Sequence, residues 1–218
     1  MNKYNHLLLS ALLHDIGKFY WRAGITGSPQ NLFKNFIDKI QFPESIDKNL
    51  LLNLISKPNE NIAKILEDSD KLSYAEEYVK KEEPEAGYPL IPIFSDIDIS
   101  KGVLPQGDLY YEPKALDIEV PFPSEGKYNK DKIKKQHLEL LEYLNQELKK
   151  IPSSNFEPFF ETLYFLLKKY TSTIALSKTE PDIALFDHLK TTTAIAACLY
   201  ENSKEKEELE RIYSGYDF

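Results

Sequence analysis

Apolar side chains recur at helical spacing over residues 4–22, near the start of the chain. The positions that share one helix face are Leu8, Leu12, Ile16 and Phe19. Gly24 follows the run and is typical of the end of a helix. The pattern predicts a single amphipathic helix over this stretch, with a histidine and an aspartate, His14 and Asp15, in its middle.

The same periodicity predicts helices at both ends of the chain and an irregular middle. Further helices are expected over residues 31–40, 46–56 and 61–81, separated by "QFPES" and "KPNE". Three more are expected in "KDKIKKQHLELLEYLNQELKKI", "FEPFFETLYFLLKKYTSTI" and "DIALFDHLKTTTAIAACLYEN". Residues 88–124 are rich in proline and contain the β-prone pieces "LIPIFSDIDI" and "DIEVPF", which predict a short, partly β excursion. The fold class is therefore mostly α.

The composition is that of a globular protein of ordinary domain size. The chain has 218 residues, of which 42% are hydrophobic and 28% charged. No apolar run approaches the roughly 20 residues that span a bilayer, and the N-terminus reaches charge too early for a signal peptide. We expect a cytoplasmic protein without a membrane partner. The single cysteine, Cys198, excludes an intramolecular disulfide and is expected to be a small core residue.

The pair His14 and Asp15 is unusual because ionisable groups in an apolar helix cost free energy unless a partner compensates them. A divalent cation is such a partner. Adjacent side chains on a helix point about 100° apart, so both can reach one ion but cannot fill its coordination shell. Asp70 in "LEDSDKLSYAEE" and His188 in "HLKTTTAIA" are the candidates for the remaining ligands.

Imidazole and carboxylate ligands together suit manganese, iron, cobalt, nickel or zinc better than calcium. Of these ions we expect manganese, nickel or cobalt. A water molecule on such an ion can act as hydroxide near neutral pH, while the ion screens the charge of a phosphodiester. Lys18 lies one helical turn after His14, where its ammonium could contact a phosphate oxygen. The expected chemistry is hydrolysis of phosphate esters, with His14, Asp15 and Lys18 as catalytic residues.

Other polar residues have a functional and a structural interpretation. Asp187 is expected to cap the helix that carries His188, although it could join the metal shell. Thr191 and Thr192 could contact phosphate or orient a ligand, and Lys190 could contact substrate or lie on the surface. His6 is expected to be a satisfied or exposed histidine, and His137 has no expected role.

The net charge of −8 argues against a protein that coats nucleic acid by electrostatics alone. The basic stretch "KYNKDKIKK" at residues 127–135 could follow a DNA backbone, but such runs are usually solvated helix faces. Tyr20 and Trp21 could stack on an unpaired base or pack in the core.

Four stretches, in this order, resemble the large subunit of type III CRISPR effector complexes. They are "LLHDIGKFYWRAG", "DSDKLSYAEE", "PLIPIFSDIDI" and "PDIALFDHLKTTTAIAACLY", and the last is the most specific. The resemblance extends over essentially the whole chain. It implies an N-terminal HD nuclease domain over residues 1–200, folded as a circularly permuted HD-type helical bundle. Carried over to this chain, the metal ligands are His188, His14, Asp15 and Asp70, and the substrate is single-stranded DNA.

This sequence departs from the family pattern in two places. Relatives commonly carry a His-His pair near "LISKPNE", where Ser56 and Lys57 stand here, so a second metal ion would lack ligands. The Gly-Gly-Asp-Asp site of the family's polymerase-like palm domains is also missing, and "QGD" at 106–108 does not replace it. The charged tail at 201–218 is expected to lead toward a palm domain, so the chain would be a fragment or half of a split subunit.

Three functions remain open at this point. The first is a metal-dependent nuclease for single-stranded DNA in an antiviral type III effector complex, with the palm part, other effector subunits and guide RNA as partners. The second is a weak or inactive HD module that docks the palm domains and neighbouring subunits, which the missing His-His pair favours. The third is an HD phosphohydrolase for small nucleotides.

Overall fold

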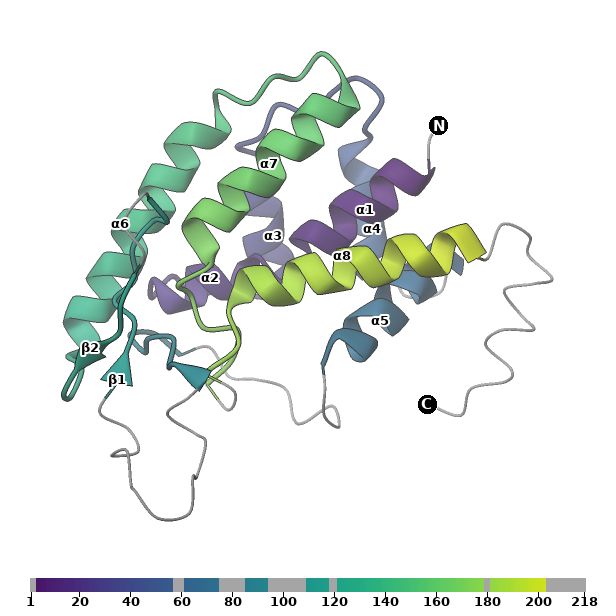
Figure 1. The fold of residues 1–218 in the computed structure, drawn as a ribbon. Helices are drawn as coiled ribbons and strands as arrows, with labels where there is room; N and C mark the ends of the chain where they lie inside the picture. Colours follow the sequence, from purple (N-terminus) through teal and green to yellow (C-terminus); the bar gives the residue numbers. More distant parts are fainter. Residues whose placement is uncertain are drawn as a thin grey trace.

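The computed structural model describes residues 3–56, 61–74, 85–93, 109–117, 121–178 and 181–202. This part of the chain is mostly helical, with a small two-stranded antiparallel sheet (Figure 1). The helices are α1 (Lys3–Leu13), α2 (Gly17–Arg22), α3 (Pro29–Ile37), α4 (Lys48–Ser56), α5 (Asn61–Ser73), α6 (Lys130–Leu148), α7 (Phe156–Thr171) and α8 (Leu185–Asn202). The strands are β1 (Leu109–Tyr110) and β2 (Ser124–Glu125).

Local signals in the sequence account for the start of two helices. Ser28 precedes α3 and accepts a hydrogen bond from the Asn31 amide, and Pro29 occupies the first helical position. Asn129 caps α6 in the same way, since its side chain accepts from the Lys132 amide. These caps satisfy backbone donors that a helix start otherwise leaves unpaired.

Helix α8, near the end of the described chain, packs along both α1 and α5 (Figure 1). A small apolar cluster joins these three helices: Leu7, Ala11, Ile65, Leu66 and Ala196. The larger core lies among α1, α2, α3, α6 and α7 and includes Phe19, Phe36 and Phe159. The packing brings the first and the last helix of the described chain side by side, with α5 against both.

The predicted helix over residues 4–22 is two helices, α1 and α2, separated by a turn at residues 14–16. In this turn the backbone hydrogen bonds span three residues instead of the four of an α-helix. They run from Ile16 N to Leu13 O (3.0 Å) and from Lys18 N to Asp15 O (2.9 Å). Gly17 opens α2 close to α3, where a β-carbon would lie 3.5 Å from the Leu32 β-carbon. His14 and Asp15 therefore lie at a break, not in the middle of a continuous helix.

The middle of the chain carries a small sheet, as predicted, and within the described residues its strands lie outside the two β-prone pieces. Strands β1 and β2 pair Leu109 with Glu125 and Tyr110 with Ser124, outside both quoted pieces. Leu90, in the first piece, makes one isolated bridge to Tyr111. Residues 94–100 and 118–120, which hold much of the two pieces, lie outside the described residues. The same is true of residues 75–81 of the helix predicted over 61–81, of Lys57, of the "QGD" segment and of the tail after residue 202.

Arg22 fixes the connection between α7 and α8 against α2. Its guanidinium is fully buried and donates hydrogen bonds to the carbonyls of Ala175 (3.2 Å) and Leu176 (2.7 Å). Leu185, the first residue of α8, then donates its amide to Ile174 O (2.8 Å). The start of α8, and with it His188, is thereby set relative to α2.

Cys198 is exposed, so the expectation that it is a core residue is wrong. Helix α8 buries the stripe that contains Leu189, Thr192 and Ala196, and a residue two positions after Ala196 points to the opposite side of a helix. In the described ranges, no helix has the length and apolar character needed to cross a membrane.

Candidate metal centre

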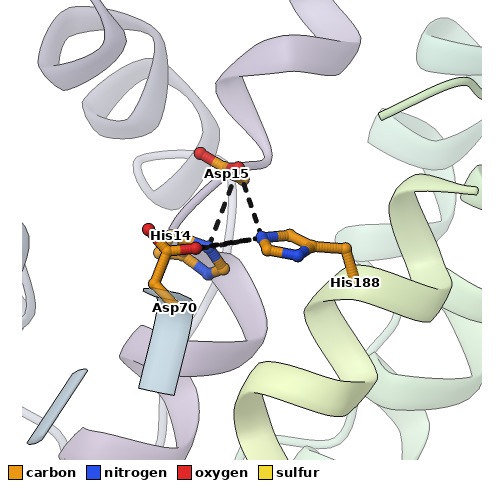
Figure 2. Close-up of side chains that lie close together, drawn as sticks. All are labelled: His14, Asp15, Asp70 and His188. Carbon is orange, nitrogen blue, oxygen red and sulfur yellow. Dashed lines mark hydrogen bonds and ion pairs between the residues drawn. The ribbon is translucent and has the colours of Figure 1, made fainter. Parts of the chain in front are cut away.

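Four side chains from three parts of the chain meet beside the break between α1 and α2 (Figure 2). His14 and Asp15 come from the turn after α1, Asp70 from α5 and His188 from the first turn of α8. One donor atom from each of the four lies within 4.8 Å of the other three. The structure thus brings together the four residues that the sequence nominates, although 174 positions separate His14 from His188.

The donor atoms face one another directly. The Nε2 atoms of His14 and His188 are 3.1 Å apart, and each is 3.1 Å from Oδ1 of Asp70. Asp15 Oδ2 lies 3.7 Å from the first of these nitrogens and 3.5 Å from the second. The dashed lines in Figure 2 join these atoms around a common centre.

His14 is oriented by the backbone of its own helix. Its Nδ1 lies 2.8 Å from the carbonyl oxygen of Ala11, which can only accept, so Nδ1 carries the proton and donates it. The other ring nitrogen, Nε2, is then the atom presented to the cluster. This is the arrangement in which an outer partner fixes the tautomer of a metal-binding histidine.

The cluster favours positive charge at its centre. Burial opposes the charged form of His14, but Asp15 and Asp70 outweigh it and raise the pKa of His14 to about 9. Burial likewise opposes ionisation of Asp70, yet hydrogen bonds from His14 and His188 lower its pKa to about 2. Two carboxylates that stay ionised in a partly buried site are suited to binding a cation.

Lys18 and Tyr74 flank the cluster. The Lys18 ammonium lies 2.8 Å from Asp15 Oδ2 and donates a hydrogen bond to the Tyr74 hydroxyl (2.9 Å). Despite burial of the carboxylate, this ammonium and His14 hold the pKa of Asp15 well below its usual range. The Tyr74 ring packs on His188, with ring centroids 4.6 Å apart. In this conformation Lys18 contacts Asp15 rather than an open surface.

The donor set fits a transition-metal ion. Imidazole nitrogens and carboxylate oxygens bind such ions at about 2.0–2.2 Å, so neighbouring ligands of an octahedral ion lie about 3.0 Å apart. The three separations of 3.1 Å among His14, His188 and Asp70 match that edge. Within the described ranges this is the one group of His, Cys, Asp or Glu residues close enough to share an ion.

Of the polar residues on α8 that the sequence singles out, some lie on the surface and others are buried near the cluster. Asp187 lies inside the first turn of α8, not before it, and its carboxylate contacts Lys190 (2.7 Å), so the capping prediction is wrong. Asp187 also lies outside the four-residue cluster. Thr191 is exposed, whereas Thr192 is buried and donates a hydrogen bond to Ser73 Oγ (2.9 Å).

The aromatic pair after the motif packs in the core. Tyr20 and Trp21 are 3% and 8% exposed, and their polar atoms bond Lys39 and the Gly27 carbonyl, so neither presents a free face for a base. His6 is buried and its Nε2 accepts from the Asp47 amide (2.9 Å), as expected of a satisfied histidine.

The basic stretch at residues 127–135 leads into α6, and three of its five lysines pair with nearby carboxylates. Lys130 pairs with Glu85 (3.2 Å), Lys135 lies 3.7 Å from Glu139, and Lys132 pairs with Glu112. These exposed pairs are typical of a solvated helix face, the structural alternative for this stretch.

Ser73 and Tyr74 are the site residues that sequence reasoning missed. Both contact His188, through Ser73 Oγ and through the Tyr74 ring. Their spacing from Asp70, three and four positions along α5 and its end, places them on the same helix side as that ligand. That spacing is the signal that could have found them.

Comparisons with known proteins agree with this picture of the fold. No protein-family model matches the chain. A relative from Methanocaldococcus jannaschii, the CRISPR system single-strand-specific deoxyribonuclease Cas10/Csm1 (subtype III-A), is 28% identical over 241 aligned positions, which cover 92% of this chain. The chain spans 28% of the length of that relative.

Solved structures of a Csm1-Csm4 assembly have a similar fold. The Csm1-Csm4 cassette in complex with pppApA matches 97% of this chain with a TM-score of 0.67 and 22% identity. The Csm1-Csm4 subcomplex of the type III-A CRISPR-Csm interference complex matches 94% with a TM-score of 0.63 and 22% identity. In both cases this chain covers 29% of the matched chain.

Proposed function

We propose that this chain, which is homologous to Cas10/Csm1 over most of its length, is a metal-dependent nuclease domain for single-stranded DNA in a type III CRISPR effector complex. The observation that carries the proposal is the meeting of His14, Asp15, Asp70 and His188 around one centre. The relative that is 28% identical is named as a single-strand-specific deoxyribonuclease, which supports the substrate class.

The fold and the order of the ligands support an HD-type site. In chain order the residues run His14 and Asp15, then Asp70, then His188, so the histidine that opens the usual H…HD…D order comes last. Helix α8 packs against α1 and α5, so His188 lies beside the other three residues although it comes last in the chain. We therefore assign residues 1–200 to a circularly permuted HD-type helical bundle.

In this proposal His14, Asp15, Asp70 and His188 hold manganese, nickel or cobalt. Such an ion, when bound, acidifies water and screens the negative charge of a phosphodiester. Lys18 holds Asp15 toward the cluster through a 2.8 Å ion pair, and in this proposal its ammonium adds positive charge beside the ion. Lys190 and Thr191, exposed on the helix that carries His188, are the proposed contacts to the DNA backbone.

The proposed partners are the palm part of the subunit and other type III effector subunits with their guide RNA. The matched structures are assemblies of Csm1 with Csm4, which supports a partner of that kind. An acidic chain with net charge −8 is compatible with this arrangement, because the other subunits can supply the basic surfaces that hold nucleic acid.

The test is cleavage of labelled single-stranded DNA by the purified chain with Mn²⁺, Ni²⁺ or Co²⁺. Cleavage should be lost in EDTA and in a His14→Ala/Asp15→Ala variant. It should persist in Asp187→Asn, which removes a carboxylate outside the cluster. Cleavage that survives loss of both His14 and Asp15 would overturn the assignment. Hydrolysis of small nucleotides with DNA left intact would support a phosphohydrolase instead.

A second candidate function is a docking module without catalysis. Ser56 and Lys57 stand where relatives commonly carry a His-His pair, so a second ion would lack those ligands. Absence of cleavage with every metal, together with binding of the palm part by the parent chain, would favour this function over the nuclease.

A further inference from the structure

Ser73 lies between the helix that carries Asp70 and the helix that carries His188. Its Oγ is 2.7 Å from the Asp70 carbonyl oxygen and 3.0 Å from Nδ1 of His188. On the α8 side, Thr192 Oγ1 lies 2.9 Å from the same Ser73 oxygen. Three hydrogen bonds thus meet at one hydroxyl group between α5 and α8.

The direction of each bond follows from the number of protons. The Asp70 carbonyl can only accept, so the single Ser73 proton points to it. Ser73 Oγ must then accept from both other partners. The Thr192 hydroxyl donates one bond, and Nδ1 of His188 must carry a proton and donate the other.

We propose that Ser73, supported by Thr192, is a positioning residue that holds His188 in the tautomer with its proton on Nδ1 and so directs Nε2 at the metal centre. The inference rests on the proposed metal site. Ser73 does for His188 what the Ala11 carbonyl does for His14. Both Nε2 atoms are then available, 3.1 Å apart, to bind one ion.

Burial makes the arrangement dependent on these side chains. The His188 side chain is 1% exposed and Thr192 is fully buried, so water cannot readily take the place of a lost hydroxyl. Without Ser73 Oγ the proton on Nδ1 of His188 would lose its acceptor in a buried site. The His188 ring would then favour the other tautomer, in which the proton sits on Nε2 and blocks metal binding there. Metal binding would then require that proton to leave or move.

The test uses Ser73→Ala, Thr192→Val and Thr192→Ser in the full chain, with Thr193→Val as the matched control. Thr193 is also buried on α8, but its hydroxyl donates to Leu189 O (2.7 Å). The tautomer of His188 is read from ¹⁵N spectra of its ring in the neutral limit of a pH series. The affinity for Mn²⁺ alone is measured by calorimetry.

We expect His188 to carry its proton on Nδ1 in the parent chain, in Thr193→Val and in Thr192→Ser. Ser73→Ala should shift the proton toward Nε2 and weaken Mn²⁺ binding about 10- to 100-fold, the range found when an outer partner of a metal ligand is lost. Thr192→Val should have a smaller effect in the same direction, restored by Thr192→Ser.

An unchanged tautomer and an unchanged Mn²⁺ affinity in Ser73→Ala would overturn the inference. Equal losses in Thr192→Val and Thr193→Val would also overturn it, because they would indicate a general packing effect. Failure of the parent chain to bind Mn²⁺ would count against the proposed function itself, while the ¹⁵N spectra would still decide the role of Ser73.

Discussion

The two histidines of the cluster are oriented by different kinds of partner. His14 donates to a backbone carbonyl of its own helix, whereas His188 depends on a side chain from another helix. Substitutions can remove the second partner but not the first. The site is therefore more sensitive to mutation around His188 than around His14, although both present the same ring nitrogen to the centre.

Asp70→Asn should weaken Mn²⁺ binding by more than about 100-fold, beyond what outer partners contribute. The carboxylate lies 3.1 Å from both imidazole nitrogens and supplies one of the two negative charges of the cluster. Asp187→Asn is the matched control, since Asp187 is 60% exposed and pairs with Lys190. Calorimetric titration with Mn²⁺ measures both. Equal affinities of the two variants would show that Asp70 is not a ligand.

His137 makes the folded chain sensitive to acid. Burial and the positive charge of Arg22 lower the pKa of His137 to about 3, below the usual 6.5. The unfolded chain therefore binds a proton that the folded chain does not, and stability is lost as pH falls below about 6.5. His137→Gln cannot take up this proton, so its loss of stability between pH 7.5 and pH 5 should be smaller by about 2 kcal/mol.

Urea unfolding of the parent chain and of His137→Gln at these two pH values measures the difference. The metal-site carboxylates and histidines are common to both chains, so their titration cancels in the comparison. The same pH dependence in both chains would show that His137 titrates normally in the folded state.

At the scale of elements, the break between α1 and α2 was the least accessible to sequence reasoning. The apolar period continues through residues 14–16, so it predicts one helix. The turn instead follows from packing of α2 against α3 and from the His14 side chain bonding the Ala11 carbonyl. It places His14 and Asp15 at the end of a helix, where both can reach α5 and α8.

The start of α6 lies against Gly87, which has a positive φ of 75°. A β-carbon at Gly87 would lie 2.5 Å from the Lys130 carbonyl oxygen, whereas one at Gly126, also at positive φ (96°), would meet nothing within 4 Å. Both alanine substitutions strain the backbone by about 1 kcal/mol. Gly87→Ala should lower the free energy of unfolding by at least about 1 kcal/mol more than Gly126→Ala, because the backbone at Lys130 must move to make room.

Thermal or urea unfolding of the two glycine variants measures this difference directly. A Gly126→Ala variant as destabilised as Gly87→Ala would show that the α6 contact adds nothing to the conformational strain.

At the scale of the whole molecule, the cluster ties α5 and α8 to the junction of α1 and α2. A cation held by all of them binds the folded chain and not the unfolded one. Mn²⁺ at about 100 times its dissociation constant should therefore raise the free energy of unfolding by about 2.7 kcal/mol. Ca²⁺ should have little effect, because imidazole is a poor ligand for it.

Differential scanning calorimetry with Mn²⁺, Ca²⁺ or EDTA tests this expectation, with Asp70→Asn as the variant that should lose the stabilisation. Equal stabilisation of the parent chain and Asp70→Asn by Mn²⁺ would place the ion elsewhere.

The amino-acid sequence was enough to predict the helical class, most helix positions and four candidate metal ligands. Helical periodicity is a local property, and the pair His14 and Asp15 stands out in an apolar run without a structure. It also predicted that His6 is a satisfied or exposed histidine, and its hydrogen bond from the Asp47 amide confirms this.

Which of these residues meet, and what surrounds them, depends on how the helices pack. The contact between His14 and His188 spans 174 positions, and no local pattern encodes such a distance. The hydrogen bond from Lys18 to Tyr74, the burial of Tyr20 and Trp21, and the hydroxyl of Ser73 beside His188 all arise where separate helices pack. The chemistry was therefore readable from residue types, whereas the geometry that makes it a site came from packing between helices.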